Sequence, residues 1–228
     1  MSVGSAKGAT IYALTITDGT QTATLSTLGT DESFTPGTGG NGGTYSLISP
    51  FSLQMGTLSS WTSTYSDPAI TDNFTITNTT GSTQTYTVTV SSPASLASPT
   101  QMSGSAGLTL TNGSNASGAT LANSSNPVYV ALIDGSSVQT LFNQPYTLSC
   151  PSAFCSTSSN ASFGTPTPIS GPGVTSSIGI TIQFTLTQGA SAGVTSVFNV
   201  VPEPTSLALV GAGILALAAV GSRRGHDG

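Results

Sequence analysis

The sequence predicts an all-β protein: an antiparallel β-sandwich or jelly-roll-like body, followed by a single C-terminal transmembrane helix. Three observations favour this fold. Apolar residues recur at every second position, which is the spacing that places them on one face of a strand. Gly, Asn and Asp separate these runs as turn signals. No segment before residue 204 shows the 3.6-residue period of a helix over three turns.

The clearest strand covers residues 178–186. Its apolar side chains alternate with Gly, Thr and Gln, and they are Ile178, Ile180, Ile182, Phe184 and Leu186. This pattern predicts one face toward a core and one covered in hydroxyl groups. Weaker patterns predict further strands at about residues 10–17 and 22–28 (joined across Asp18-Gly19), 44–55, 107–111, 118–122 and 194–200.

Two turn signals predict hairpins. Asp134-Gly135 separates the apolar runs 128–133 and 138–142, and Asp-Gly in this setting is a strong hairpin signal. Asn, Thr and Gly at 78–81 separate the alternating runs that end at Ile76 and resume at Tyr86.

In total we expect eight to ten strands. The Gly-rich stretch 36–43 and the Ser, Pro and Gly-rich stretch 156–173 are predicted to be long loops.

Charge and composition exclude several functional classes. Ser and Thr make up 75 of the 228 residues, and charged residues only 5%. Within residues 1–200, Lys7 is the one basic side chain against six acids, so we expect no nucleic-acid partner. His226 is the sole histidine, which leaves the body without an imidazole for a catalytic triad or a metal site. We therefore predict no enzyme activity, no cofactor and no metal.

The C-terminal segment differs from the body. Residues 205–222 carry no charge, and 18 helical residues at about 1.5 Å each span about 27 Å, close to a hydrocarbon core of about 30 Å. Arg223 and Arg224 follow, and paired arginines favour a cytoplasmic end, with residues 1–200 outside. We thus predict two parts, 1–200 and 201–228. The alternative is a buried C-terminal helix.

Three parts of this segment occur in a specific order: Val201-Pro202-Glu203-Pro204, the apolar span, and Arg223-Arg224. This order resembles the PEP-CTERM sorting signal of exported bacterial proteins. The resemblance implies that the inner membrane holds the precursor and that an exosortase, a membrane-embedded processing enzyme, recognises Pro202, Glu203 and Pro204 and supplies the catalytic groups. Two prolines also favour an extended segment that a cleft can bind.

The same resemblance implies a secretion signal. Residues 1–20 contain no continuous apolar run, since residues 9–16 alternate like a strand and Lys7 is the one early positive charge. We expect the true start of the protein to lie further upstream. The alternatives are a signal already removed and a chain that is not exported.

Cys150 and Cys155 are the two cysteines of the chain. We expect a local disulfide, with two free thiols as the alternative. Trp61, Tyr65 and Tyr45 are candidates for stacking on sugar rings, with a place in the core as the alternative.

The carboxyl groups have several alternative roles. Asp18 and Asp134 each precede Gly, so turn formation explains them. We expect Asp31-Glu32 and the pair Asp67 and Asp72 to be solvated loop charges. A calcium site and a hydrolase pair are the alternatives, although the spacing matches no calcium motif.

Together these features predict an exported surface or extracellular-matrix protein. We expect a structural or adhesive role in exopolysaccharide or biofilm. The alternative is a carbohydrate-binding module without catalysis, whose partner would be an extracellular polysaccharide.

Overall fold

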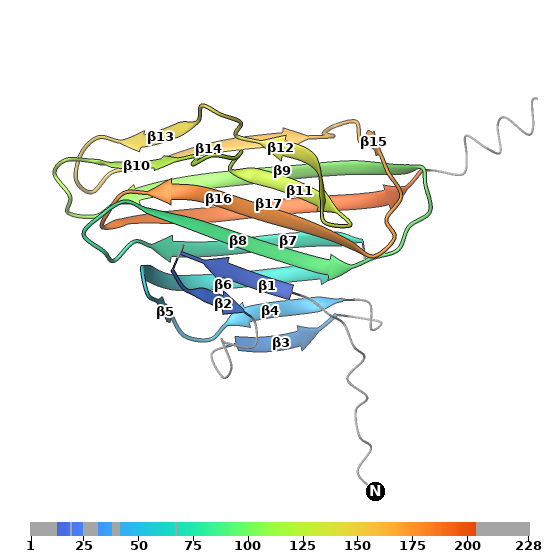
Figure 1. The fold of residues 1–228 in the computed structure, drawn as a ribbon, viewed down its shortest axis with the longest axis horizontal. Coiled ribbons are helices and arrows are strands. Elements are labelled where there is room, and N and C mark those ends of the chain that lie inside the picture. The colour runs from blue at the N-terminus through green and yellow to red at the C-terminus, as the bar shows by residue number, and fades with distance from the viewer. Residues whose placement is uncertain (1–12, 19, 25–31, 38–41, 67, 204–228) are drawn as a thin grey trace, which may run out of the picture.

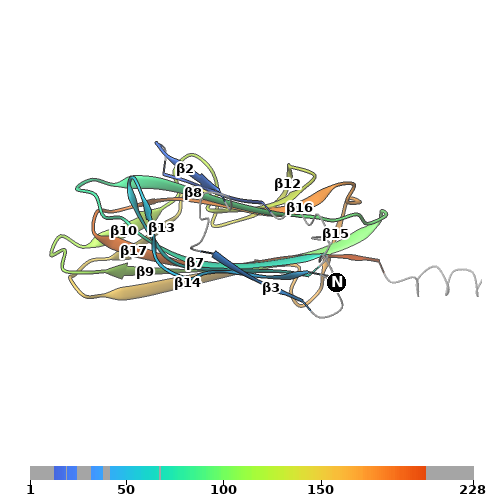
Figure 2. The same ribbon diagram turned by 90° about the horizontal axis from the view of Figure 1, so that it is seen from below.

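A computed structural model describes residues 13–18, 20–24, 32–37, 42–66 and 68–203. All the described strands pair antiparallel and form two sheets that pack face to face as a sandwich (Figures 1 and 2). The predicted all-β sandwich is therefore confirmed. The predicted helix 205–222 lies outside the described residues.

The eight-stranded sheet has the order β12-β11-β16-β8-β1-β2, and β10 and β13 extend it beside β16. Its strands are β1 (Ala13–Thr17), β2 (Thr22–Thr24), β8 (Gln84–Pro93), β10 (Ala119–Ala122), β11 (Tyr129–Ile133), β12 (Ser136–Leu141), β13 (Thr147–Cys150) and β16 (Ser177–Leu186).

The nine-stranded sheet has the order β14-β9-β17-β7-β6-β4-β3, and β15 pairs with β9 and β5 with β6. Its strands are β3 (Glu32–Pro36), β4 (Gly43–Leu47), β5 (Phe51–Leu53), β6 (Gly56–Ser66), β7 (Ala69–Thr77), β9 (Thr100–Asn112), β14 (Ser156–Phe163), β15 (Ile169–Gly171) and β17 (Ala190–Pro202).

The core lies between the sheets and comes from the alternation seen in the sequence. In β16 the five predicted apolar side chains are all buried. The largest fully buried side chains are aromatic: Trp61, Tyr86, Tyr129, Phe184 and Phe198. Buried tyrosine hydroxyls need partners, and the Tyr129 hydroxyl donates to the carbonyl of Val197 at 2.9 Å while that of Tyr86 donates to the carbonyl of Met55. These two bonds each link the eight-stranded sheet to the nine-stranded one.

The hairpin at Asp134-Gly135 is confirmed, because β11 and β12 pair across it. Asp134 and Gly135 have φ angles of 51° and 76°, the left-handed conformation that a two-residue hairpin turn requires. The turn at Asp18 likewise joins the paired strands β1 and β2.

The hairpin expected around residues 78–81 is wrong. β7 and β8 lie in different sheets, so the chain crosses between the layers here. Asn78 is fully buried at the crossing, and its side-chain amide donates to the carbonyls of Ser82 and Leu186 at 2.8 and 2.9 Å. The alternation of apolar and polar residues indicates which face of a strand is buried. It does not indicate which sheet the strand joins.

The expected number of strands is also wrong, because the described residues contain seventeen. Part of the stretch 156–173, predicted as a loop, forms the strands β14 and β15. Its side chains are mostly small and polar, so it lacks the apolar alternation by which a strand is recognised. In the other predicted loop, 36–43, Pro36 ends β3 and Gly43 begins β4, and residues 38–41 lie outside the described residues.

Candidate functional site

The Pro-Glu-Pro segment begins at the end of β17, an interior strand of the nine-stranded sheet. Val201 pairs with Gln101 and Pro202 pairs with Thr100 on β9. On the other side the ladder has already ended, since β7 begins at Ala69 opposite Asn199. Proline lacks an N–H group, and at Pro202 this position faces the side where pairing with β7 has ended, so the sheet loses no hydrogen bond.

The described part of this segment is extended, as expected for a proline-rich stretch. Beyond the strand, the Glu203 N–H donates to the carbonyl of Pro99 at 3.3 Å. Pro202 is exposed, and Val201 and Glu203 are half-buried. Pro204, Arg223 and Arg224 lie outside the described residues. The part of the chain that the structure describes contains no helix that could cross a membrane.

A comparison with known protein families matches residues 200–224 to the PEP-CTERM protein-sorting motif. The chain carries this sorting motif. The PEP-CTERM motif implies an exported protein that an exosortase processes and that associates with the cell surface. The match begins at Val200, so the motif overlaps the last residues of β17. No curated protein matches the chain significantly.

The PEP-CTERM motif leaves one end of the sandwich. Strand β17 runs from Ala190, opposite Asn112, to Pro202, opposite Thr100, so the two ends of β9 mark the two ends of the body. Figure 1 shows β17 ending at the right, whereas the turns that follow β7, β9, β13 and β16 gather at the left. We call the end that carries these four turns the distal end.

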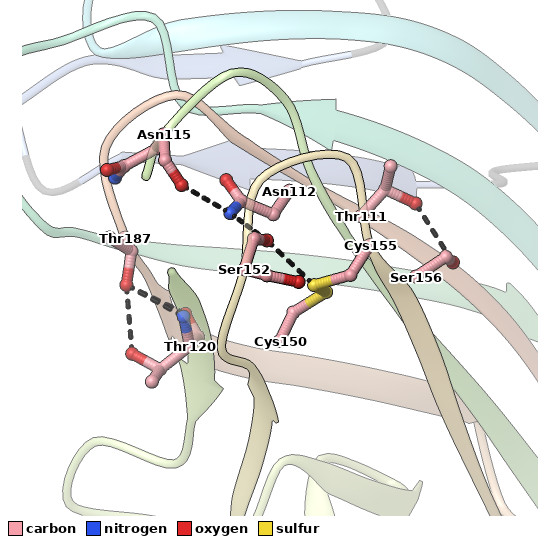
Figure 3. The surroundings of a disulfide bond; sticks show 9 residues. All are labelled: Thr111, Asn112, Asn115, Thr120, Cys150, Ser152, Cys155, Ser156 and Thr187. Atoms are coloured by element: carbon pink, nitrogen blue, oxygen red, sulfur yellow. Dashed lines mark hydrogen bonds between the residues drawn. A yellow bond between two sulfur atoms is a disulfide. The ribbon is translucent and has the colours of Figure 1, made fainter. Parts of the chain in front are cut away.

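A disulfide joins Cys150 and Cys155 at the distal end (Figure 3). Between them, Phe154 has a φ angle of 56°, and its N–H donates to the carbonyl of Gly113 at 2.7 Å. Phe154 is 82% exposed. Asn112 holds the neighbouring loops together, because its side-chain amide donates to the carbonyls of Asn115 and Ser152 at 2.8 and 2.7 Å.

An open groove of about 550 Å³ lies beside this disulfide. Its lining is uncharged and rich in hydroxyl and amide groups: Ser82, Thr83, Asn115, Ser117, Gly118, Ala119, Thr120, Ser149, Cys150, Pro151, Thr187 and Gln188. Figure 3 shows Thr120 and Thr187 side by side, and their hydroxyl oxygens are 2.9 Å apart. The sequence pattern gave no signal for this groove, because four separate turns form it.

The candidate stacking aromatics Trp61, Tyr65 and Tyr45 lie on the inner face of the nine-stranded sheet. Trp61 is 1% exposed and Tyr65 is 4% exposed, while Tyr45 is half-buried. Tyr45 contacts the ring of Phe34, which is 43% exposed at the sheet edge. Their positions favour the alternative of a place in the core, since neither Trp61 nor Tyr65 presents a ring face to solvent.

Asp72 points into the core from β7 and is 1% exposed, so the expectation of a solvated loop charge is wrong for this residue. The Trp61 indole N–H donates to Asp72 Oδ1 at 2.9 Å, and Asp72 Oδ2 has no hydrogen-bond partner among the described residues. Burial raises the pKa of Asp72 to about 6, against the opposing effect of hydrogen bonds from Trp61 and Ser63. Asp67, its suggested companion in a calcium site or carboxylate pair, lies outside the described residues. In the separate set Asp31-Glu32, Asp31 also lies outside them, and Glu32 starts β3.

Asp18 and Asp134 occupy turns, as expected, but each also fixes a second segment. Asp18 Oδ2 accepts from the N–H of Met55 at 2.7 Å, which connects the two sheets. Burial disfavours the Asp18 carboxylate, yet backbone N–H groups of Gln21, Thr20 and Met55 lower its pKa overall.

Asp134 accepts hydrogen bonds from both the hydroxyl and the N–H of Thr175, and from the N–H groups of Ser177 and Ser176. These bonds lower the pKa of Asp134. The carboxylate therefore fixes the segment before β16, a role that its Asp-Gly motif does not reveal.

Proposed function

We propose that this chain is a non-catalytic structural or adhesive component of the extracellular matrix, and that its PEP-CTERM motif delivers it there. The observation that carries the proposal is the outer face of the nine-stranded sheet. A shallow hollow of about 280 Å³ on this face is lined by hydroxyl and carboxamide side chains, among them Thr62, Asn73, Thr75, Asn160 and Thr195.

This lining contains no charged residue. Neutral donors and acceptors on a flat surface suit many weak hydrogen bonds to a polyhydroxylated polymer, which itself offers hydroxyl groups. Gly107 and Gly193 deepen the hollow, because they place no side chain over the sheet. A Cβ at Gly107 would lie 2.7 Å from both Asn160 Oδ1 and Thr195 Oγ1.

The direction of display supports the same role. The PEP-CTERM motif leaves one end of the sandwich, and the loops with the exposed Phe154 lie at the other. A body held at the membrane through its C-terminal segment therefore directs its distal end outward, toward the matrix.

The experiment compares matrix cohesion in the native host with and without this protein. We expect the strain that lacks it to lose cohesion and to regain it with the full chain. A variant with Asn73→Asp and Asn160→Asp should restore cohesion poorly, since it adds charge to the neutral hollow. Ser52→Asp with Ser59→Asp is the matched control, because both residues are exposed and line neither the hollow nor the distal groove. Unchanged cohesion without the protein would contradict the proposed role.

The alternative function is a carbohydrate-binding module, and the distal groove favours it. A groove of about 550 Å³ has the size of a small-ligand site. Thr83 and Gln188 line it, and neither side chain makes a hydrogen bond within the described residues that their replacement would break. Retention on matrix polysaccharide that falls for Thr83→Ala with Gln188→Ala, but not for Thr62→Ala, would favour this function over the first.

A further inference from the structure

Strand β14 forms an edge of the nine-stranded sheet, beyond β9 (Figure 1). It is eight residues long, with the sequence Ser-Thr-Ser-Ser-Asn-Ala-Ser-Phe, and pairs with β9 along its whole length. It contains no charged residue and no proline, and its pairing with β9 has no bulge. An edge strand with these properties is a template for pairing with another strand.

The other described edges are protected in recognised ways. Strand β3 has Glu32 at its start and Pro36 at its end. The pairing of β12 is shifted by an irregularity between Ala131 and Leu132. The remaining edge strands have only three or four residues, and they are β2, β5, β13 and β15. Among the described edges, β14 thus combines length with the absence of protection.

The backbone groups of β14 that face away from β9 can be assigned. The Asn112 N–H donates to the carbonyl of Cys155, and bonded pairs alternate along an antiparallel ladder. The odd-numbered residues of β14 therefore bond to β9. The even-numbered residues direct their N–H and C=O groups outward, and these are Ser156, Ser158, Asn160 and Ser162. All four side chains are exposed.

We propose that β14 pairs antiparallel with β14 of a second copy of this chain, which joins two nine-stranded sheets into one. Neither β14 nor β9 behind it carries a charge, so a symmetric pair brings no like charges together. The four outward residues pair fully when the two-fold axis passes through Ser159. Ser158 then lies opposite Asn160 of the second copy, and Ser156 lies opposite Ser162.

The partner is a second copy because the edge is complementary to itself and the PEP-CTERM motif collects many copies at one surface. Two eight-residue strands bury much less than the roughly 1,200 Å² of a stable complex. Pairing is therefore weak in dilute solution and is favoured where the chains are concentrated. The inference rests on the proposed matrix role and gives it a mechanism of cohesion.

Covalent trapping tests the pairing and its register. In the full chain, purified in mild detergent, Ser159→Cys places two thiols on the two-fold axis, where facing Cβ atoms are about 4.5–5.5 Å apart. We expect mild oxidation to give at least about tenfold more covalent dimer than Thr62→Cys, an exposed position on the same sheet but away from its edges. Equal dimer yields from the two variants would overturn the proposal.

Charge variants in the Ser159→Cys background sharpen the test. Ser158→Lys with Asn160→Lys places like charges opposite each other twice, so we expect the dimer yield to fall to that of Thr62→Cys. Ser158→Lys with Asn160→Asp places opposite charges there and should restore the yield. A dimer yield that is unchanged in both charge variants would overturn the proposed register. Trapping of purified chains is independent of matrix cohesion, so either proposal can fail without the other.

Discussion

The PEP-CTERM segment and the sandwich body encode function in different ways. The segment is recognised over residues 200–224 by the order of its parts, and it specifies a destination. The body uses about 200 residues of alternating sequence to build two sheets, and its functional surfaces come from residues far apart in the chain. A short linear signal can therefore be recognised from the sequence alone, whereas a functional surface on a sandwich can be recognised only from the folded structure. Three changes test this division, in order of expected effect.

Deletion of residues 203–228 should have the largest effect. It leaves β17 complete through Pro202, so the body keeps its pairing with β9. We expect nearly all of the chain to leave the membrane and surface fractions, while its urea unfolding curve stays that of the full chain. Fractionation of the native host measures the first result. Unaltered fractionation would show that the body, and not the PEP-CTERM segment, determines the location.

Asp72→Asn should change the stability of the body and leave its location alone. The pKa of Asp72 in the folded chain is about 6, above the ordinary 3.8, so the folded state binds more protons than the unfolded state between these values. The free energy of unfolding therefore falls as pH rises through this window and stays low above it. The neutral amide of the variant removes the free-energy cost of burying a charged carboxylate. Its oxygen can still accept a hydrogen bond from the Trp61 indole N–H.

We expect Asp72→Asn to raise the free energy of unfolding by up to about 3 kcal/mol above pH 6. The gain should shrink toward pH 4. Urea denaturation of both chains at pH 4 and pH 8 measures it, with fractionation as the control for location. Equal stability of the two chains at pH 8 would show that the buried carboxylate of Asp72 does not destabilise the folded chain.

Asp134→Asn should have a smaller effect of opposite sign. The pKa of Asp134 is lowered by hydrogen bonds from Thr175, Ser177 and Ser176, so the carboxylate stabilises the fold above the unfolded value of 3.8 and loses this effect in acid. Asparagine tolerates the left-handed turn conformation, so the hairpin itself remains. Urea curves should show a loss of stability at neutral pH that disappears in acid. A loss that stays constant with pH would point to the turn instead of the charge.

The sequence predicts the parts of this molecule that depend on local pattern. The alternation of residues predicts the strand β16, and Asp134-Gly135 predicts the hairpin turn. Both predictions succeed because residues adjacent in the chain determine these structures. The crossing at Asn78 was missed because local alternation does not determine the choice of sheet. Strand β14 was missed because Ser, Thr and Asn give no apolar signal at an edge that faces solvent.

The surroundings of the candidate site residues were the least predictable. Asp72 belongs to a regular alternating strand, but its position in the pattern is one that an apolar residue would normally fill. That mismatch was the available signal for a buried carboxyl. The distal groove had no comparable signal, because the turns around Asn115, Pro151 and Thr187 meet only in the folded chain.

The intact mass of this protein in the native host, with and without exosortase, shows whether exosortase removes the C-terminal segment. We expect a membrane-bound form that retains residues 205–222 when exosortase is missing. With exosortase present, we expect a shorter surface form that ends near Pro204. The same mass in the same fraction from both strains would show that exosortase does not process this chain.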